Sequence, residues 1–206
     1  MSVDAKKVTA GKPKIGGAVF RAPVGTTLPT DAVSTLNAAF EDTGYISEDG
    51  VTNDKSRETN VLKAWGGDEV LNSQTGKTDT FKMQFIEVMN VNTLKVVHGE
   101  NNVSGSLDAG ITIRENSNEL DHYSWVIEMV LNNNCVKRIV IPDAQVVELA
   151  EVVYKDDQAV GYDATIKAYP NSGMNGDTHR EYIKKVAQSG QSGQSGQSGA
   201  SGTSGE

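Results

Sequence analysis

The sequence has few of the residues that build disulfide frameworks, metal centres or membrane spans. Among 206 residues there is one cysteine, Cys135, there are three histidines, and no apolar run is long enough to cross a bilayer. A single cysteine cannot form an internal disulfide, so nothing indicates an oxidising compartment. No apolar run follows the initial Met-Ser-Val-Asp-Ala-Lys-Lys either. The sequence therefore predicts a soluble protein that is made in the cytoplasm and does not insert into a membrane.

Clusters of reactive side chains are also missing from the sequence. His98, His122 and His179 are widely separated and lack a neighbouring cysteine or a paired metal-ligand spacing. Adjacent acids occur at four places, but without the spacing of a calcium loop, so turn chemistry and solvated charge explain them better. A nucleophile elbow, a phosphate loop and a dinucleotide fingerprint are absent. We therefore expect no enzyme activity, no metal and no cofactor.

Aromatic residues make up only 6% of the chain, and the formal net charge is -8. The charge is unevenly distributed, because residues 15–187 hold 15 Lys and Arg against 25 Asp and Glu, whereas four of the first fourteen residues are lysines. An acidic body of this kind repels phosphate backbones. The basic pair Lys137–Arg138 has no row of aromatic residues beside it. Specific nucleic-acid binding is not expected.

Composition divides the chain into a body and two extensions. Residues 1–14 are polar and basic and predict an N-terminal arm that becomes ordered only by contact with another surface. Residues 15–170 form one β domain, followed by a C-terminal connector or arm at 171–187. Residues 188–206 repeat Gln-Ser-Gly without an apolar anchor, which predicts a flexible tail. The tail is either a tether or simply a solvated terminus.

Alternation with period two dominates the body and predicts antiparallel strands. Asn132–Asn134 tolerate a left-handed backbone and form a hairpin turn, and Pro142 and Pro170 are expected to end strands. Gly16 and Gly17 indicate a bulge or a close backbone contact. Strands are predicted at 15–22, 81–85, 105–114, 123–131, 136–141, 146–154 and 159–169.

Helix signals are few. Asn90 is suited to cap a helix from Val91 to His98, and Gly99 follows its end. A second short helix is expected to begin at Thr30 and to end before Gly44. The balance predicts a mainly β fold, a two-sheet antiparallel sandwich or flattened barrel with one flanking α-helix, a long loop and terminal arms.

The stretch from Gly44 to Gly67 has an unusual pattern. Tyr45 and Ile46 look like the end of a buried strand, Glu48–Gly50 has turn chemistry, and Val61–Trp65 resumes a strand pattern. Between them the chain is polar, which predicts an extended loop at about residues 50–78. Such a small domain has more unpaired backbone than it can satisfy alone, and neighbouring subunits can supply the missing partners. The pattern therefore indicates self-assembly.

This stretch, with Leu28-Pro29-Thr30-Asp31 before it and the hairpin Val152–Tyr169 after it, resembles the major tail (tail tube) proteins of long-tailed, non-contractile bacteriophages. The resemblance covers roughly residues 8–187. It implies a virion protein that forms hexameric rings, which stack into the tube through which the genome leaves the capsid. Implied partners are further copies of the chain and the tape-measure, tail terminator and baseplate or initiator proteins. DNA would pass through the lumen without specific binding.

The resemblance also implies roles for particular residues. The long loop would reach the adjacent ring, and both terminal arms would brace neighbours. An acidic lumen would let DNA slide. Candidate acids on the less apolar faces of strands are Glu128, Glu148, Glu151 and Asp163, although ordinary solvent exposure explains them equally well. Candidate residues of the inter-ring contact loop are Tyr45, Glu48, Asp49, Gly50, Val51, Asn53, Trp65, Gly66 and Gly67.

Two other classes of protein remain open at this point. A monomeric carbohydrate-binding or adhesion sandwich would also be acidic and rich in turns, but it needs an exposed aromatic platform. A hydrolase on the same scaffold needs a reactive cluster. For Trp65, core packing and a subunit contact fit the sequence equally well.

Overall fold

The computed structural model describes residues 3–186, so the tail predicted at 188–206 lies outside the described residues. Within residues 3–186, one α-helix, α1 (Val91–His98), and three short 3-10 turns accompany the strands. The strands are β1 (Lys12–Pro13), β2 (Val19–Pro23), β3 (Glu41–Asp42), β4 (Ile46–Lys63), β5 (Glu69–Phe85), β6 (Val103–Ser106), β7 (Gly110–Ile113), β8 (Tyr123–Leu131), β9 (Cys135–Leu149), β10 (Tyr162–Ala168) and β11 (Arg180–Lys185).

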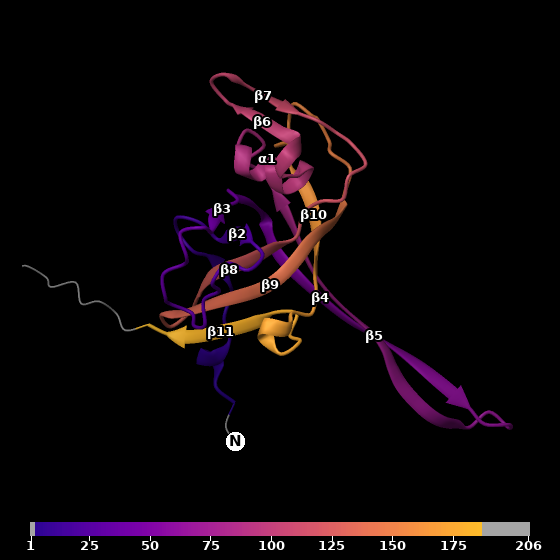
Figure 1. Cartoon of the computed structure of the whole chain (residues 1–206). Coiled ribbons are helices and arrows are strands. Elements are labelled where there is room, and N and C mark those ends of the chain that lie inside the picture. Colours follow the sequence, from indigo (N-terminus) through magenta and orange to yellow (C-terminus); the bar gives the residue numbers. More distant parts are fainter. Residues whose placement is uncertain (1–2, 187–206) are drawn as a thin grey trace, which may run out of the picture.

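Most strands belong to one large antiparallel sheet in the order β3-β2-β8-β9-β10-β5-β4. Strand β9 carries two partners on the same edge, β11 along 135–140 and β10 along 144–149, so the sheet divides there into two parts (Figure 1). Strands β6 and β7 form a separate small sheet. The predicted mainly β, antiparallel fold with one flanking helix is confirmed, and the described part of the large sheet ends at β3 and β4 without closing into a barrel.

One hydrophobic core joins residues of β2, β5, β8, β9, β10 and α1. The alternation seen in the sequence decides which side chains of β5 belong to the core. Phe81, Met83 and Phe85 point inward, whereas Lys82 is exposed. Trp125 and Ile127 face the same core from β8. Burial of each such side chain contributes about 1.5–3 kcal/mol to the free energy of unfolding.

The predicted helix is confirmed. Asn90 caps it, because its side-chain oxygen accepts a hydrogen bond from the backbone N–H of Asn92 at 2.9 Å. Gly99 follows with a φ of 96° and an extended ψ of 147°, so it ends the helix at positive φ but not in the left-handed helical conformation. The buried hydroxyl of Thr93 donates to the carbonyl of Thr43 at 2.7 Å, which attaches α1 to the chain just before β4.

The helix expected from Thr30 is wrong. The Asp31 carboxylate accepts hydrogen bonds from the N–H groups of Val33 and Ser34, both at 2.6 Å, as a helix cap would. However, the guanidinium of Arg138 donates to the carbonyls of Asp31 and Ser34, both at 2.8 Å. A helix would need these carbonyls for its own ladder. The segment therefore stays irregular and is held against β9 by Arg138.

Pro142 does not end a strand, since β9 continues through it to Leu149. The β8–β9 register shifts between Tyr123 and Trp125, so Pro142 lies at a bulge, where its missing N–H removes no ladder bond. Its carbonyl still accepts a hydrogen bond from the Ser124 hydroxyl at 2.7 Å. The hairpin turn at Asn132–Asn134 is confirmed, and φ is 59° at Asn133 and 58° at Asn134.

Several other boundaries differ from the prediction. The single strand expected at 105–114 is the β6–β7 hairpin, and the pairing of β9 with β10 stops at Leu149, well before the predicted end at 154. Strand β2 begins only at Val19, after two glycines at positive φ. A Cβ on Gly17 would lie 2.4 Å from a carboxylate oxygen of Asp42, which confirms the expected close approach. The connector at 171–187 contains β11, a strand that the sequence did not predict.

Candidate assembly surfaces

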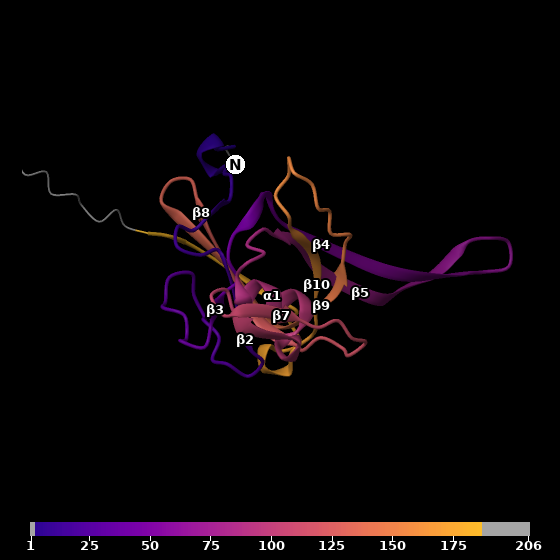
Figure 2. The same ribbon diagram turned by 90° about the horizontal axis from the view of Figure 1, so that it is seen from above.

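The segment predicted as an extended loop is instead a long β hairpin. Strands β4 and β5 pair from Ile46 opposite Phe85 out to Lys63 opposite Glu69. Figures 1 and 2 show that the outer part of this hairpin projects far from the body as a two-stranded ribbon. We refer to residues 58–76 as the ribbon and to residues 53–57 and 77–81 as its base. The prediction of a loop is wrong because it relied on the low strand propensity of charged and polar residues. Pairing between the two strands satisfies the backbone N–H and C=O groups of these residues in spite of that propensity.

The tip of the ribbon carries apolar side chains that none of the described residues covers. The turn closes through the N–H of Ala64, which donates to the carbonyl of Asp68 at 2.8 Å, with Gly66 and Gly67 at positive φ. Leu62 lies directly opposite Leu71 in the register. We call the four exposed side chains the apolar tip: Leu62, Trp65, Val70 and Leu71. Trp65 is fully exposed, so the core-packing alternative for this residue is wrong.

The residues predicted for the contact loop separate into two groups. Tyr45 is exposed and precedes β4, which contradicts its expected place in a buried strand. Residues 48–50 form a bulge within β4, between Ile46 and Val51, rather than a turn between elements. Val51 packs against the core, and Asn53 belongs to the ribbon base. Only Trp65, Gly66 and Gly67 lie at the tip.

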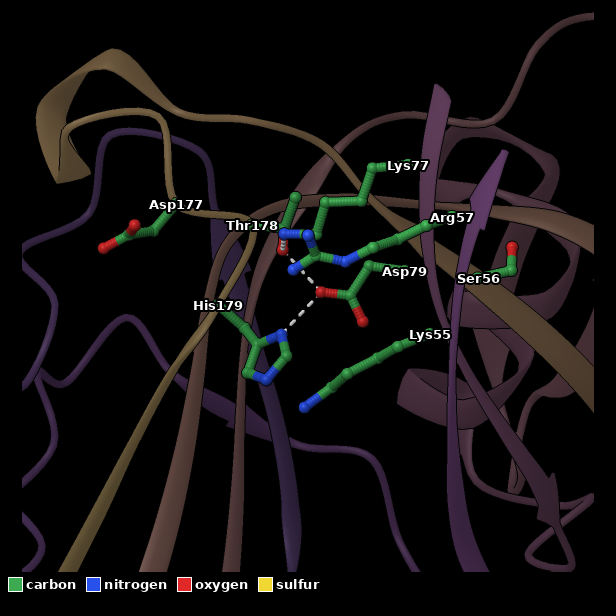
Figure 3. Close-up of a pocket in the computed structure, with 8 residues that line it drawn as sticks. All are labelled: Lys55, Ser56, Arg57, Lys77, Asp79, Asp177, Thr178 and His179. Atoms are coloured by element: carbon green, nitrogen blue, oxygen red, sulfur yellow. Dashed lines mark hydrogen bonds and ion pairs between the residues drawn. The ribbon is translucent and has the colours of Figure 1, made fainter. Parts of the chain in front are cut away.

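A buried carboxylate fixes the ribbon base to the C-terminal segment. Asp79 is 1% exposed and accepts hydrogen bonds from Asn53 at 2.8 Å, from the Thr178 hydroxyl at 2.5 Å and from His179 Nδ1 at 2.6 Å (Figure 3). Burial alone would raise the pKa of Asp79, but these three hydrogen bonds outweigh it and hold the pKa below its ordinary value. Since an ionised carboxylate only accepts, Nδ1 of His179 carries its proton.

Further charges extend this contact. Glu181 on β11 forms ion pairs with Lys137 at 2.8 Å and with Lys55 at 3.7 Å, and the hydrogen bond from Lys137 lowers the pKa of Glu181. Beside Asp79 the structure has a pocket of about 210 Å³, into which the side chains of Lys55, Arg57 and Lys77 extend (Figure 3). The ribbon is therefore anchored at its base and unsupported beyond it.

Sequence reasoning missed the contact around Asp79. His179 lies in the segment predicted as a connector, and Asp79 precedes an alternating strand without a motif around it. A usable signal was the position of Asp79 two residues before the inward-facing Phe81, which places its side chain on the core face of β5. A carboxylate on that face needs hydrogen-bond donors, and only residues distant in sequence supply them.

One of the four candidate acids is not a surface residue. Glu128 is 4% exposed and pairs with Arg138, which is 2% exposed, and with Lys14 at 2.5 Å. The expectation that it is exposed on a less apolar strand face is wrong, because the segment containing Asp31 and Ser34 covers that face of the sheet. The ion pair holds this covering segment in place.

Two of the remaining candidates share a face of the sheet. Glu148 lies opposite Thr165, whose hydroxyl is 3.4 Å from its carboxylate, and Asp163 lies two residues earlier on the same strand face. We call this the outer face of β9, β10 and β5. It also carries Lys82, opposite Thr165, and Lys167, so its charge is mixed. Glu151 is exposed in the connection that follows β9.

Unpaired strand edges are a third feature of the surface. Among the described residues, β4 pairs only with β5, so the outer edge of an 18-residue strand is open. Strand β11 likewise pairs only with β9 within residues 3–186. Open backbone groups of this kind are sites at which another strand can add.

Other kinds of site are not found in the part of the chain that the structure describes. Residues 3–186 contain no group of three His, Cys, Asp or Glu side chains that could hold a metal ion. None of the helices described there is long and apolar enough to cross a membrane.

An antiparallel sheet with open edges, a projecting ribbon and an exposed apolar tip are features typical of structural proteins that contact other chains. The family model described as "Phage tail tube protein" matches residues 4–187. The chain therefore belongs to the phage tail tube protein family, which confirms the resemblance at the level of the family, and its role is that of a structural component of the virion tail.

The chain is similar to a chain in a solved structure described as the PVC sheath–tube complex of an extracellular contractile injection system in its extended state. The identity is 10%, the TM-score is 0.40, and the match covers 84% of this chain and 93% of the other. The comparison with curated proteins found no match.

Proposed function

We propose that copies of this chain form hexameric rings, that the rings stack into the tail tube, and that this tube conducts the genome into the host cell. In this role the chain is made in the host cytoplasm and carries out no catalysis. Its partners are further copies of itself, the tape-measure protein within the tube, and the terminator and the baseplate or initiator proteins at its ends. DNA passes through without specific binding.

The observation that carries the proposal is the ribbon. A two-stranded hairpin that projects alone is marginally stable in water, so a ribbon of this length is expected to lie against a neighbouring subunit. Its apolar tip supports the same conclusion, because exposed apolar side chains gathered at one place mark interaction sites. Burial of each of the four tip side chains in a neighbour would contribute about 1.5–3 kcal/mol before the entropy of association is subtracted.

In the assembled tube we place the ribbon against a subunit of the adjacent ring, while open strand edges join subunits within a ring. Strand addition between copies satisfies the free backbone groups of β4 and β11 without new side-chain chemistry. The N-terminal segment and β11 would brace neighbouring copies in addition to their contacts within the chain.

The test is a shortened hairpin. Replacing residues 58–76 with Asn-Gly joins Arg57 to Lys77, which are opposite each other in the register, through a two-residue turn. The base with Asn53 and Asp79 stays intact, so the subunit should fold with an unchanged thermal midpoint. Negative-stain microscopy should show rings but no tubes.

A matched variant separates the length of the ribbon from its apolar tip. Polar replacements at Leu62, Trp65, Val70 and Leu71 keep the hairpin but remove its apolar surface, and they should also prevent stacking. Tubes of normal length from the shortened hairpin would contradict the proposed role of the ribbon.

The two alternatives gain no support from the described residues. The exposed aromatic side chains Tyr45, Trp65 and Tyr154 belong to three separate segments of the chain and not to one platform.

A further inference from the structure

A strongly basic surface lies where the N-terminal segment, the turn between β8 and β9 and the end of β11 come together, at the lower left of the body in Figure 1. We define this basic end as residues 3–14, 131–137 and 183–186, which together hold seven lysines and one aspartate. The three segments are joined by hydrogen bonds: Asn132 N–H to the Thr9 hydroxyl at 2.7 Å, the Asn133 amide to the carbonyl of Lys6 at 2.5 Å, and Val186 N–H to the carbonyl of Asn134 at 2.7 Å. The N-terminal arm is thus docked on its own subunit, unlike the expectation that only another surface orders it.

Most of these lysines have no counter-charge in the described part of their own chain. Within residues 3–186, only Lys14 and Lys137 of the seven form ion pairs. Lys6, Lys7, Lys12, Lys184 and Lys185 are exposed. The same surface exposes four large apolar side chains: Val3, Val8, Ile183 and Val186.

The opposite end of the molecule is acidic. We define this acidic end as residues 107–121 and 151–158, which hold seven acids against Arg114 and Lys155. All seven acids are exposed, and among them only Glu115 has an ion-pair partner within the described chain, His98. These residues border α1, β6 and β7 at the top of Figure 1, where Leu107 and Tyr154 are also exposed.

We propose that the basic end of one copy docks on the acidic end of the next copy, and that this contact sets the direction of stacking. The proposal rests on the tube proposed above. Each end combines exposed apolar side chains with surrounding charge of one sign, which is the composition of a protein interface with a polar rim. The two ends carry seven charges of the major sign each, so a second copy of this chain supplies the matching surface.

The geometry of such a contact also explains polymer growth. A contact between two different patches of one subunit is heterologous and repeats without closing when the patches lie at opposite ends. Two basic ends or two acidic ends repel one another, so inverted addition is disfavoured. Because the charges are exposed, added salt should slow stacking while leaving the apolar contacts of the ribbon in place.

The experiment uses paired charge reversals on the full chain. One variant carries Lys184→Glu and Lys185→Glu, and the other carries Glu119→Lys and Asp121→Lys. Lys82→Glu with Lys167→Glu is the control, since it changes the net charge like the first variant but lies on the outer face of the sheet. Ring and tube formation are followed by microscopy and light scattering, and DNA binding by mobility shift.

Each end variant alone should form rings but should need about tenfold more protein to form tubes, whereas the control should resemble the wild type. An equal mixture of the two end variants should restore tubes, because half of its contacts then join an unchanged basic end to an unchanged acidic end, and the other half join the new glutamates to the new lysines. Thermal melting checks that each variant folds, and Lys6→Glu with Lys7→Glu replaces the first pair where it does not.

The outcomes separate this inference from the proposed function. If the wild type forms no rings or tubes, the proposed function fails. If the wild type forms tubes and both end variants do so equally well, or if their mixture is not restored, the function stands and the docking of unlike ends is refuted. A loss of DNA binding in the Lys184 and Lys185 variant without a change in stacking would likewise overturn it in favour of a nucleic-acid surface.

Discussion

Replacing Asp79 with Asn tests whether a buried carboxylate holds the ribbon base to the C-terminal segment. In the wild type, one oxygen of Asp79 accepts from Asn53 and the other accepts from Thr178 and His179. The asparagine amide has one oxygen and one NH2 group, so either Asn53 or the Thr178–His179 pair faces a donor instead of an acceptor. The substitution keeps the size of the side chain but removes one or two hydrogen bonds to a charged group.

The magnitude follows from these contacts. A buried hydrogen bond to a charged group contributes about 1.5–3 kcal/mol, so we expect the free energy of unfolding to fall by about 2–3 kcal/mol at pH 7. The effect depends on pH in a defined direction. Because the folded pKa of Asp79 is lowered, its contribution is fully present above its unfolded pKa of about 3.9 and is lost as the pH falls through the folded pKa.

Urea denaturation of the unassembled subunit, at several pH values between about 7 and 3, measures this prediction. The difference between the wild type and D79N should be largest above about pH 5 and should shrink toward pH 3. Asp54→Asn is the control, because Asp54 is exposed on the adjacent strand and should change stability by less than about 0.5 kcal/mol. Equal stabilities of D79N and the wild type at pH 7, or a difference that does not vary with pH, would refute the reasoning.

Three further substitutions test individual contacts. Arg138→Met removes the buried partner of the Glu128 carboxylate and should lower the free energy of unfolding, measured in urea, by about 3–5 kcal/mol. Adding Glu128→Leu to this variant removes the unpaired charge and should recover part of the loss. Gly17→Ala places a Cβ 2.4 Å from a carboxylate oxygen of Asp42 at a φ of 126°, so the thermal midpoint should drop by several degrees, equivalent to about 1–3 kcal/mol. Asn90→Ala removes the helix cap and should reduce stability by about 1 kcal/mol, with faster hydrogen exchange confined to α1. A midpoint equal to that of the wild type would contradict the corresponding contact in each case.

The parts of the fold that were predictable from the sequence have local causes. Alternation at 81–85 and 123–131 identified two core strands, and the Asn132–Asn134 turn joined the second of them to β9. The capped helix after Asn90 was equally clear, since its signals lie within ten residues of one another. In each case neighbouring residues decide the backbone conformation, so one window of sequence contains the necessary information.

The errors have long-range causes. Arg138 lies more than a hundred residues after Asp31, yet its hydrogen bonds prevent a helix there. Strand β11 forms because β9 offers a free edge, and nothing in residues 180–185 alone requires a strand. The ribbon is a strand pair whose polar residues have low strand propensity and gain their hydrogen bonds only from each other. A property that depends on a distant partner cannot be obtained from a local pattern.

The distribution of charge shows why the net charge of -8 does not describe any one surface. Glu128 is neutralised by Arg138 inside the protein, and the outer face with Glu148 and Asp163 also carries Lys82 and Lys167. A surface with both signs interspersed has a weak potential beyond about 8–10 Å at physiological salt, because opposite charges cancel within one screening length. Such a face neither holds nor strongly repels a polyanion. The acidic end holds seven acids against Arg114 and Lys155, and in the contact proposed above this charge acts between copies of the chain.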